Sequence, residues 1–99
     1  MGLSLPAFSQ TTTNVTMTRL RTGWNIDSFA IETIEPIVNP ATCGTPDGYI
    51  SDLSLPGYST YYAAALTALV TKAPLVITVQ DSECFADRPK IIGIALDVK

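Results

Sequence analysis

Two cysteines carry the most defined chemistry in this sequence. Cys43 and Cys84 lie too far apart to form a CxxC redox or zinc motif. They either pair with each other or serve as two small buried apolar residues. The even count, low charge and frequent threonine favour one disulfide in a secreted or periplasmic protein. Closing a loop of that length would stabilise the fold by about 4 kcal/mol.

The chain contains no histidine, which excludes Ser-His-Asp and Cys-His catalysis and imidazole metal ligands. Asp81, Glu83 and Asp87 cluster in one segment but lack the ligand series and glycine turn of a calcium loop, so we expect a solvated acidic loop. Glu32 and Glu35, three apart on a strand, face opposite sides and cannot form a glycosidase pair. We expect no enzymatic activity, no metal and no cofactor.

Length and composition bound the remaining possibilities. Ninety-nine residues, 46% of them hydrophobic, are enough for one domain with one core. The net charge is −3 and the six basic residues are scattered, which argues against nucleic-acid binding. No apolar run reaches the 18 or so residues of a membrane span. We expect residues 1–12 to be a flexible N-terminus or a signal or expression remnant, and residues 13–99 to form the domain.

A hairpin is predicted to open the domain, with strands at 13–22 and 26–35 around Gly23-Trp24-Asn25, because Gly and Asn tolerate positive φ. Pairing Thr22 with Ile26 sets the register and pairs Arg21 with Asp27. The predicted apolar face holds Val15, Met17, Phe29 and Ile31. The predicted polar face holds Asn14, Thr16, Thr18, Ala30 and Glu32, with Glu32 opposite Thr16.

Three further strands are predicted at 48–55, 75–80 and 90–98, with Gly93 as a bend. A proline-rich loop at 36–47 and a polar loop at 81–89 carry one cysteine each.

One helix is predicted over residues 61–73, capped by Ser59 or Thr60 and stopped by Pro74. Its expected core stripe is Tyr62, Leu66, Leu69 and Ala73. The opposite side is uncharged apart from Lys72. Such a surface fits a subunit interface, although an alanine-rich helix could also be exposed without consequence. We expect the interface to contain Tyr61, Ala64, Thr67, Ala68 and Thr71.

The order of three strands, one helix and two strands predicts a mainly β fold with one α-helix. Specifically, it is typical of the OB-fold, a five-stranded Greek-key barrel with the helix between strands 3 and 4. Such barrels bind oligonucleotides or oligosaccharides. Because a basic groove is lacking, a carbohydrate or a protein is the expected partner.

Three stretches resemble the B subunits of bacterial AB-type toxins, closest to the pertussis, subtilase-cytotoxin and typhoid-toxin-like branch. They are the hairpin RLRTGWNIDSF (19–29), the helix and strand STYYAAALTALVTKAPLVITVQ (59–80) and the closing strand PKIIGIAL (89–96). The resemblance implies a ring of five subunits with helices lining the pore and glycan receptors on the barrel exteriors.

The family's sugar sites use polar side chains of the first two strands, and the matching positions here are Thr13, Asn14, Thr16 and Glu32. Where the family more often presents serine with tyrosine nearby, this segment has only threonines. Glu32 would repel a sialic-acid carboxylate unless that group faced the threonines. A threonine-rich outer face also suits β-strands on propensity alone, without any sugar site. Trp24, at the hairpin tip, either stacks on a sugar ring or packs against a neighbouring subunit.

The sequence therefore predicts a non-catalytic, glycan-binding subunit of a secreted homopentamer that recognises host oligosaccharides, with a catalytic A subunit as a possible further partner. The alternative is a secreted or periplasmic structural or inhibitor-like protein whose small-residue helix docks a protein partner.

Overall fold

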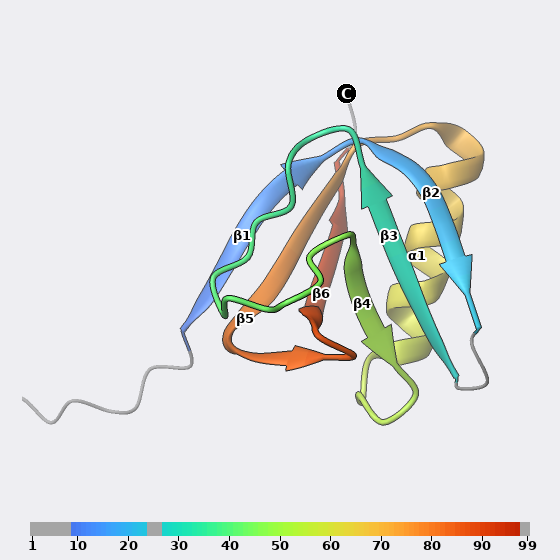
Figure 1. Cartoon of the computed structure of the whole chain (residues 1–99). Helices are drawn as coiled ribbons and strands as arrows, with labels where there is room; N and C mark the ends of the chain where they lie inside the picture. The colour runs from blue at the N-terminus through green and yellow to red at the C-terminus, as the bar shows by residue number, and fades with distance from the viewer. Residues whose placement is uncertain (1–8, 24–26, 98–99) are drawn as a thin grey trace, which may run out of the picture.

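Six strands and one helix make up the protein in a computed structural model that describes residues 9–23 and 27–97. The elements in chain order are β1 (Gln10–Val15), β2 (Met17–Thr22), β3 (Ser28–Thr33), β4 (Tyr49–Asp52), α1 (Tyr58–Thr71), β5 (Leu75–Phe85) and β6 (Arg88–Leu96). The expectation of a mainly β protein with one helix is confirmed (Figure 1). β1 begins three residues before the expected domain boundary, and residues 1–8 of the expected N-terminal tail lie outside the described residues.

The strands form one sheet in the order β1-β5-β6-β4-β3-β2. All neighbours pair antiparallel except β4 and β6, which are parallel. The two ends of this order, β1 and β2, follow each other along the chain. Figure 1 shows them diverging from the top of the molecule to opposite sides of the strongly curved sheet.

Thr16 separates β1 from β2 because its backbone leaves the strand ladder. Its amide donates to Glu35 Oε1 at 2.7 Å, its hydroxyl donates to Glu35 Oε2 at 2.9 Å, and its carbonyl accepts from the Ile34 amide at 3.0 Å. The Thr16 amide holds the pKa of Glu35 below its ordinary value. The strand can therefore bend here and pair with β5 on one side and β3 on the other.

The β2–β3 pairing is shifted by three residues from the prediction. Thr22 lies opposite Phe29 instead of Ile26, and Arg21 lies opposite Ala30 instead of Asp27. This register places Arg19 opposite Glu32, which matches opposite charges across the strands. The expected pairings of Arg21 with Asp27 and of Thr16 with Glu32 are wrong.

The segment expected to be a polar loop at 81–89 is instead a β-hairpin. β5 runs on to Phe85 and β6 starts at Arg88, so only Ala86 and Asp87 form the turn. Both have positive φ, 50° and 64°. A type I′ hairpin turn requires positive φ at both of its central residues, and Asn and Gly usually occupy these positions. Because neither residue is Gly or Asn, this turn left no clear signal in the sequence.

The inward face of the helix shares only Tyr62 with the expected core stripe. The inward stripe is Tyr58, Tyr61, Tyr62, Ala65 and Ala68, and the two alanines are 0% and 1% exposed. Tyr58 and Tyr62 reach the sheet and pack against Phe29 with ring centres 5.5 Å apart. The small alanines let the second half of the helix approach the strands closely.

Leu66 and Leu69, expected in the core, are 42% and 37% exposed. The start of the helix also differs from expectation: Gly57 occupies the N-cap position, with no side-chain cap from Ser59 or Thr60. Lys72 ends the helix in a left-handed conformation, with φ 59°, before Pro74.

The core lies between the curved sheet and α1. Its fully buried members are Val15, Phe29, Ile31, Tyr49, Ala65, Ala68, Leu75, Ile77, Val79 and Ile91. All four residues of the predicted hairpin apolar face belong to it or pack against it. Ala30, expected on the polar face, is 5% exposed.

Candidate functional site

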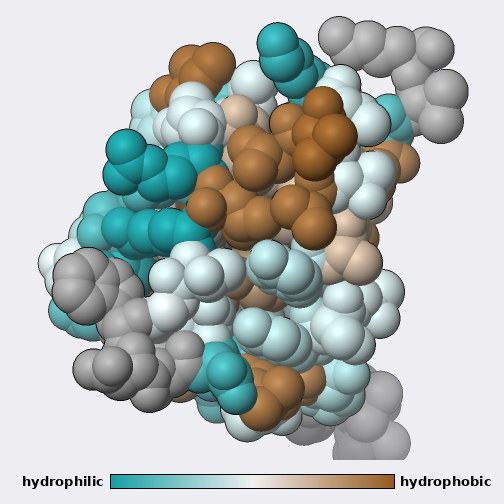
Figure 2. Space-filling view, turned by 90° about the vertical axis from the view of Figure 1, so that its right-hand side faces the viewer, coloured by the Kyte–Doolittle hydropathy of each residue, from teal (hydrophilic) through white to brown (hydrophobic). Residues whose placement is uncertain are grey.

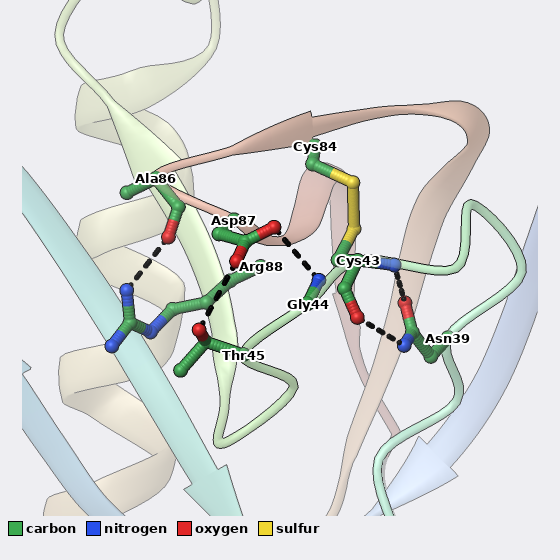
Figure 3. The surroundings of a disulfide bond; sticks show 8 residues. All are labelled: Asn39, Cys43, Gly44, Thr45, Cys84, Ala86, Asp87 and Arg88. Atoms are coloured by element: carbon green, nitrogen blue, oxygen red, sulfur yellow. Dashed lines mark hydrogen bonds between the residues drawn. A yellow bond between two sulfur atoms is a disulfide. The ribbon is translucent and has the colours of Figure 1, made fainter.

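A disulfide joins Cys43 to Cys84 and fastens the long 34–48 connection to the β5–β6 hairpin. The bond confirms the cysteine pairing favoured by the sequence. Asn39 braces the same loop, because its amide nitrogen donates to the Cys43 carbonyl at 3.0 Å and its amide oxygen accepts from the Cys43 amide at 2.8 Å (Figure 3). The proline-rich loop thus reaches across to the tip of the hairpin.

Asp87 fastens the same loop from the hairpin side. Its carboxylate accepts from the Gly44 amide at 2.7 Å and from the Thr45 hydroxyl at 3.2 Å, and its carbonyl accepts from the Thr45 amide at 2.9 Å. Figure 3 shows this carboxylate directed toward the loop, away from the guanidinium of Arg88. These bonds and the disulfide hold the hairpin tip, next to Arg88, against the loop.

Arg88 and Arg21, from β6 and β2, converge on the carboxylate of Asp47. Arg88 donates from Nε at 2.6 Å and from Nη2 at 3.1 Å, while Arg21 donates from Nη2 at 2.8 Å. A third Arg88 nitrogen, Nη1, donates to the Ala86 carbonyl at 2.7 Å and fixes the guanidinium over the hairpin turn. The hydrogen bonds from Arg88, supported by Arg21, lower the pKa of Asp47.

A pocket of about 200 Å³ opens beside these two arginines. It lies between the end of β2, the first half of β3, Ile50 of β4 and the β5–β6 turn. Its walls are formed by Arg21, Thr22, Gly23, Ser28, Ala30, Ile50, Ala86 and Arg88. An apolar floor with a few polar groups at the rim is the usual composition of a small-molecule site.

Of the residues expected to bind a glycan, the four that the structure describes have separate surroundings. Thr13 and Asn14 lie on β1 opposite Ile77 and Val76 of β5, with Thr13 half-buried and Asn14 exposed. Thr16 is exposed, but its amide and hydroxyl are bound to Glu35.

Glu32 is engaged elsewhere, in ion pairs with Arg21 at 3.3 Å and Arg19 at 3.5 Å. It therefore does not converge with Thr16. Trp24, the remaining expected sugar contact, lies outside the described residues.

The outer surface of α1 is apolar and uncharged. Leu66, Leu69 and Val70 are 42%, 37% and 74% exposed, and no residue of α1 is charged. Figure 2 faces the side of the molecule where α1 and β2 lie, and an apolar patch occupies its upper half. We call Leu66, Leu69 and Val70 the outer helix face.

The residues expected to form a subunit interface divide between two sides of the helix. Ala68 is part of the core, and Tyr61 points inward, donating to the Ile92 carbonyl at 2.8 Å. Ala64 is half-buried. Thr67 and Thr71 are exposed, and their hydroxyls donate to helix carbonyls one turn earlier. Of these five residues, Thr67 and Thr71 are fully available beside the outer helix face, Ala64 is available in part, and Tyr61 and Ala68 face the core.

The acidic residues at the β5–β6 hairpin have separate partners: Asp81 accepts from Thr11, and Glu83 pairs with Lys90. Within residues 9–23 and 27–97, three or more potential metal-ligating side chains nowhere gather into a cluster. In the same part of the chain, α1 is too short to cross a membrane.

Comparisons with protein-family models, curated proteins and solved structures find no match to this chain. The arginine pocket was also missed by reasoning from sequence. Arg21, Asp47 and Arg88 come from three distant segments, and only the register of β2 and the bend of the 34–48 loop bring them together. The sequence signal for this pocket was a pair of arginines on β2, Arg19 and Arg21, with only one acidic partner, Glu32, on β3.

Proposed function

We propose that this protein is a secreted, non-catalytic, glycan-binding OB-fold subunit that assembles into a homo-oligomer, with five copies as the expected number. The strand connectivity supports the OB-fold. If β1 and β2 are counted as one bent strand, the chain has five strands with the helix between the third and fourth, and the third and fifth strands pair in parallel.

The observation that carries the proposal is the outer helix face. A small acidic protein normally covers an exposed helix with charged residues, whereas Leu66 and Val70 here remain in contact with water. Full burial of an exposed leucine or valine side chain contributes roughly 1.5–3 kcal/mol, and covering the exposed parts of Leu66 and Val70 would contribute a corresponding fraction of that free energy. Packing of helices from neighbouring copies would remove this apolar surface from water and place the helices around a central axis.

The pocket beside Arg21 and Arg88 supports the ligand-binding part of the proposal. OB-folds bind oligosaccharides on the face of their second and third strands, between the loop after the first strand and the loop before the last. The pocket is lined by the corresponding elements here: β3, β4, Gly23 before the first loop and Ala86 in the final turn. A host cell-surface glycan is the proposed ligand, and a catalytic A subunit is a further proposed partner of the assembled ring.

Light scattering coupled to size exclusion tests the assembly. The wild-type chain is expected to elute as an oligomer and Val70→Glu as a folded monomer. A glutamate at position 70 is solvated in the monomer, but it would be buried without a partner where another subunit covers this position. Thr60→Glu is the matched control, since it adds the same charge at an exposed position in the first turn of the same helix. Ala68→Glu is unsuitable because it would bury a charge in the core.

The same experiment addresses the second candidate, a monomeric protein whose outer helix face docks a different protein. A monomeric wild type would favour this alternative and overturn the ring.

For the ligand, a glycan array probed with verified oligomer is the direct measurement. An array without a single bound glycan would overturn the lectin role and leave the assembly intact.

A further inference from the structure

A second cavity lies where the end of α1 meets the bend between β1 and β2. Its volume is about 290 Å³, and it is lined by Thr16, Met17, Ala68, Leu69, Lys72 and Ala73. Figure 1 shows the end of α1 near the top of the molecule, beside the point from which β1 and β2 diverge. We call this cavity the helix-end groove. It shares no lining residue with the arginine pocket.

The walls of the helix-end groove are mostly apolar. Ala68 belongs to the core and is 1% exposed, so it closes the groove on the side of the protein interior. Ala73 is half-buried, and the short side chains of these two alanines leave space that a longer side chain would fill. Leu69 and Met17 supply larger apolar surfaces, and methionine adapts its shape to what it contacts. Burial of an alkyl chain in this groove is therefore favourable.

The polar recognition that this groove can offer comes from Lys72. Among the described residues that line the groove, Lys72 alone is charged, and it is exposed and makes no ion pair within that part of the chain. A lysine stem can lie along an apolar wall while its ammonium group stays in water. The amide and hydroxyl of Thr16 already donate to the two carboxylate oxygens of Glu35, so neither is available to a ligand.

We propose that the helix-end groove binds a free medium-chain fatty acid, with the alkyl chain against Met17 and Leu69 and the carboxylate paired with Lys72. The volume limits the chain length, since about 290 Å³ lies just below the roughly 300–1,000 Å³ of sites for drug-sized ligands. The single positive charge selects an anionic head group. This binding site is additional to the proposed assembly and glycan binding and does not depend on either.

A series of straight-chain carboxylates tests the apolar part of the site. Butyrate, hexanoate and octanoate are titrated into the full chain, and binding is followed by the backbone amide resonances in NMR spectra. Each additional methylene group that is buried should tighten binding about fourfold. The resonances of Met17, Leu69, Lys72 and Ala73 are expected to shift. Affinity that does not rise with chain length, or shifts confined to other parts of the chain, would overturn the site.

The charge needs a separate test, because a lysine at this end of a helix also complements the helix dipole. Octanol has an alkyl chain of the same length without the carboxylate. An exposed ion pair contributes little, so octanoate should bind about two- to fivefold more tightly than octanol. Lys72→Gln should remove that advantage and leave octanol binding unchanged. Lys90→Gln is the matched control, because Lys90 pairs with Glu83 and does not line the groove. Equal binding of octanol and octanoate by the wild type would overturn the carboxylate assignment.

Ala73→Phe tests whether the ligand lies inside the groove. The larger side chain should fill the cavity and weaken octanoate about tenfold or more, because it takes the volume that the alkyl chain needs. Undiminished binding to this variant would overturn the groove as the site. A circular dichroism melt shows whether the variant folds, and if it does not, Lys72→Gln at its exposed position still decides the question.

Two other occupants of the groove are outcomes of the same experiments. If octanoate binds the Val70→Glu monomer but not an assembled wild type, a neighbouring copy occupies the groove and the fatty-acid assignment is overturned. If the chain binds vesicles of phosphatidylcholine and phosphatidylglycerol but not octanoate, the groove contacts a membrane surface and the assignment is likewise overturned. Octanoate binding that rises with chain length and weakens in both Lys72→Gln and Ala73→Phe supports it. A glycan array without a bound glycan would overturn the lectin role and leave this site intact.

Discussion

Removing the Cys43–Cys84 disulfide should lower the free energy of unfolding by about 4 kcal/mol. The cysteines are 41 positions apart, and the chain-entropy relation for a loop of this length gives that value at 25 °C. The folded state loses little else, because Asn39 and Asp87 continue to hold the loop through hydrogen bonds. The loss therefore arises from the larger freedom of the unfolded chain.

The assay is urea unfolding followed by circular dichroism, comparing wild type with the Cys43→Ala/Cys84→Ala double variant. With a slope of about 2 kcal/mol per molar, the midpoint should fall by roughly 2 M. Reduced wild type should behave like the double variant, and Asp87→Ala, which keeps the disulfide, should lose much less. A loss below about 1 kcal/mol in the double variant would refute the loop-entropy reasoning.

Three further changes test other parts of the structure by thermal or urea unfolding. Ala86→Gly should stabilise the protein by about 0.5–1 kcal/mol, because relief of the left-handed strain outweighs the added unfolded-state freedom; a loss would contradict the strained turn. Hydrogen bonds to the charged carboxylates of Asp47 and Glu35 lower the pKa of each group in the folded protein. Their contribution to the free energy of unfolding should therefore be fully present above about pH 5 and should be lost as the pH falls through the lowered pKa values. Asp47→Asn and Glu35→Gln should each flatten that decline, and an unchanged profile in both would count against these hydrogen bonds. Ser51→Ala should stabilise by up to about 1 kcal/mol, because the buried Ser51 hydroxyl has no hydrogen-bond partner; a loss above 1 kcal/mol would show that it has one.

The sequence identified the elements of this fold better than their orientation. Alternating apolar residues correctly placed Val15, Phe29 and Ile31 in the core, and the even cysteine count correctly favoured a disulfide. The helix was located and Tyr62 was correctly assigned to its inward face, but Leu66 and Leu69 were wrongly assigned there because the largest aliphatic residues were assumed to face the core. Close packing against the sheet instead required Ala65 and Ala68.

The candidate site was much harder to predict. Its position depends on a β2–β3 register that differs by three residues from the predicted one. It also depends on a turn formed by Ala86 and Asp87, of which only Asp87 is a residue type that tolerates positive φ well. The sugar-site prediction instead followed the resemblance to toxin B subunits, which pointed to the polar side chains of the first two predicted strands. Arg21 and Arg88 could be recognised as neighbours only in the folded protein, where β-sheet pairing and the disulfide bring their separate segments together.

The bond between Thr16 and Glu35 makes one backbone proton a reporter for the bend between β1 and β2. Elsewhere in the sheet, an amide proton is protected from exchange with solvent deuterium by a carbonyl, which does not titrate. At Thr16 the acceptor is a carboxylate, so protection of that single amide should disappear on acidification before its neighbours respond. One proton on Glu35 thus weakens a bond that holds the crossover between the two halves of the sheet, while the bond from the Ile34 amide to the Thr16 carbonyl remains.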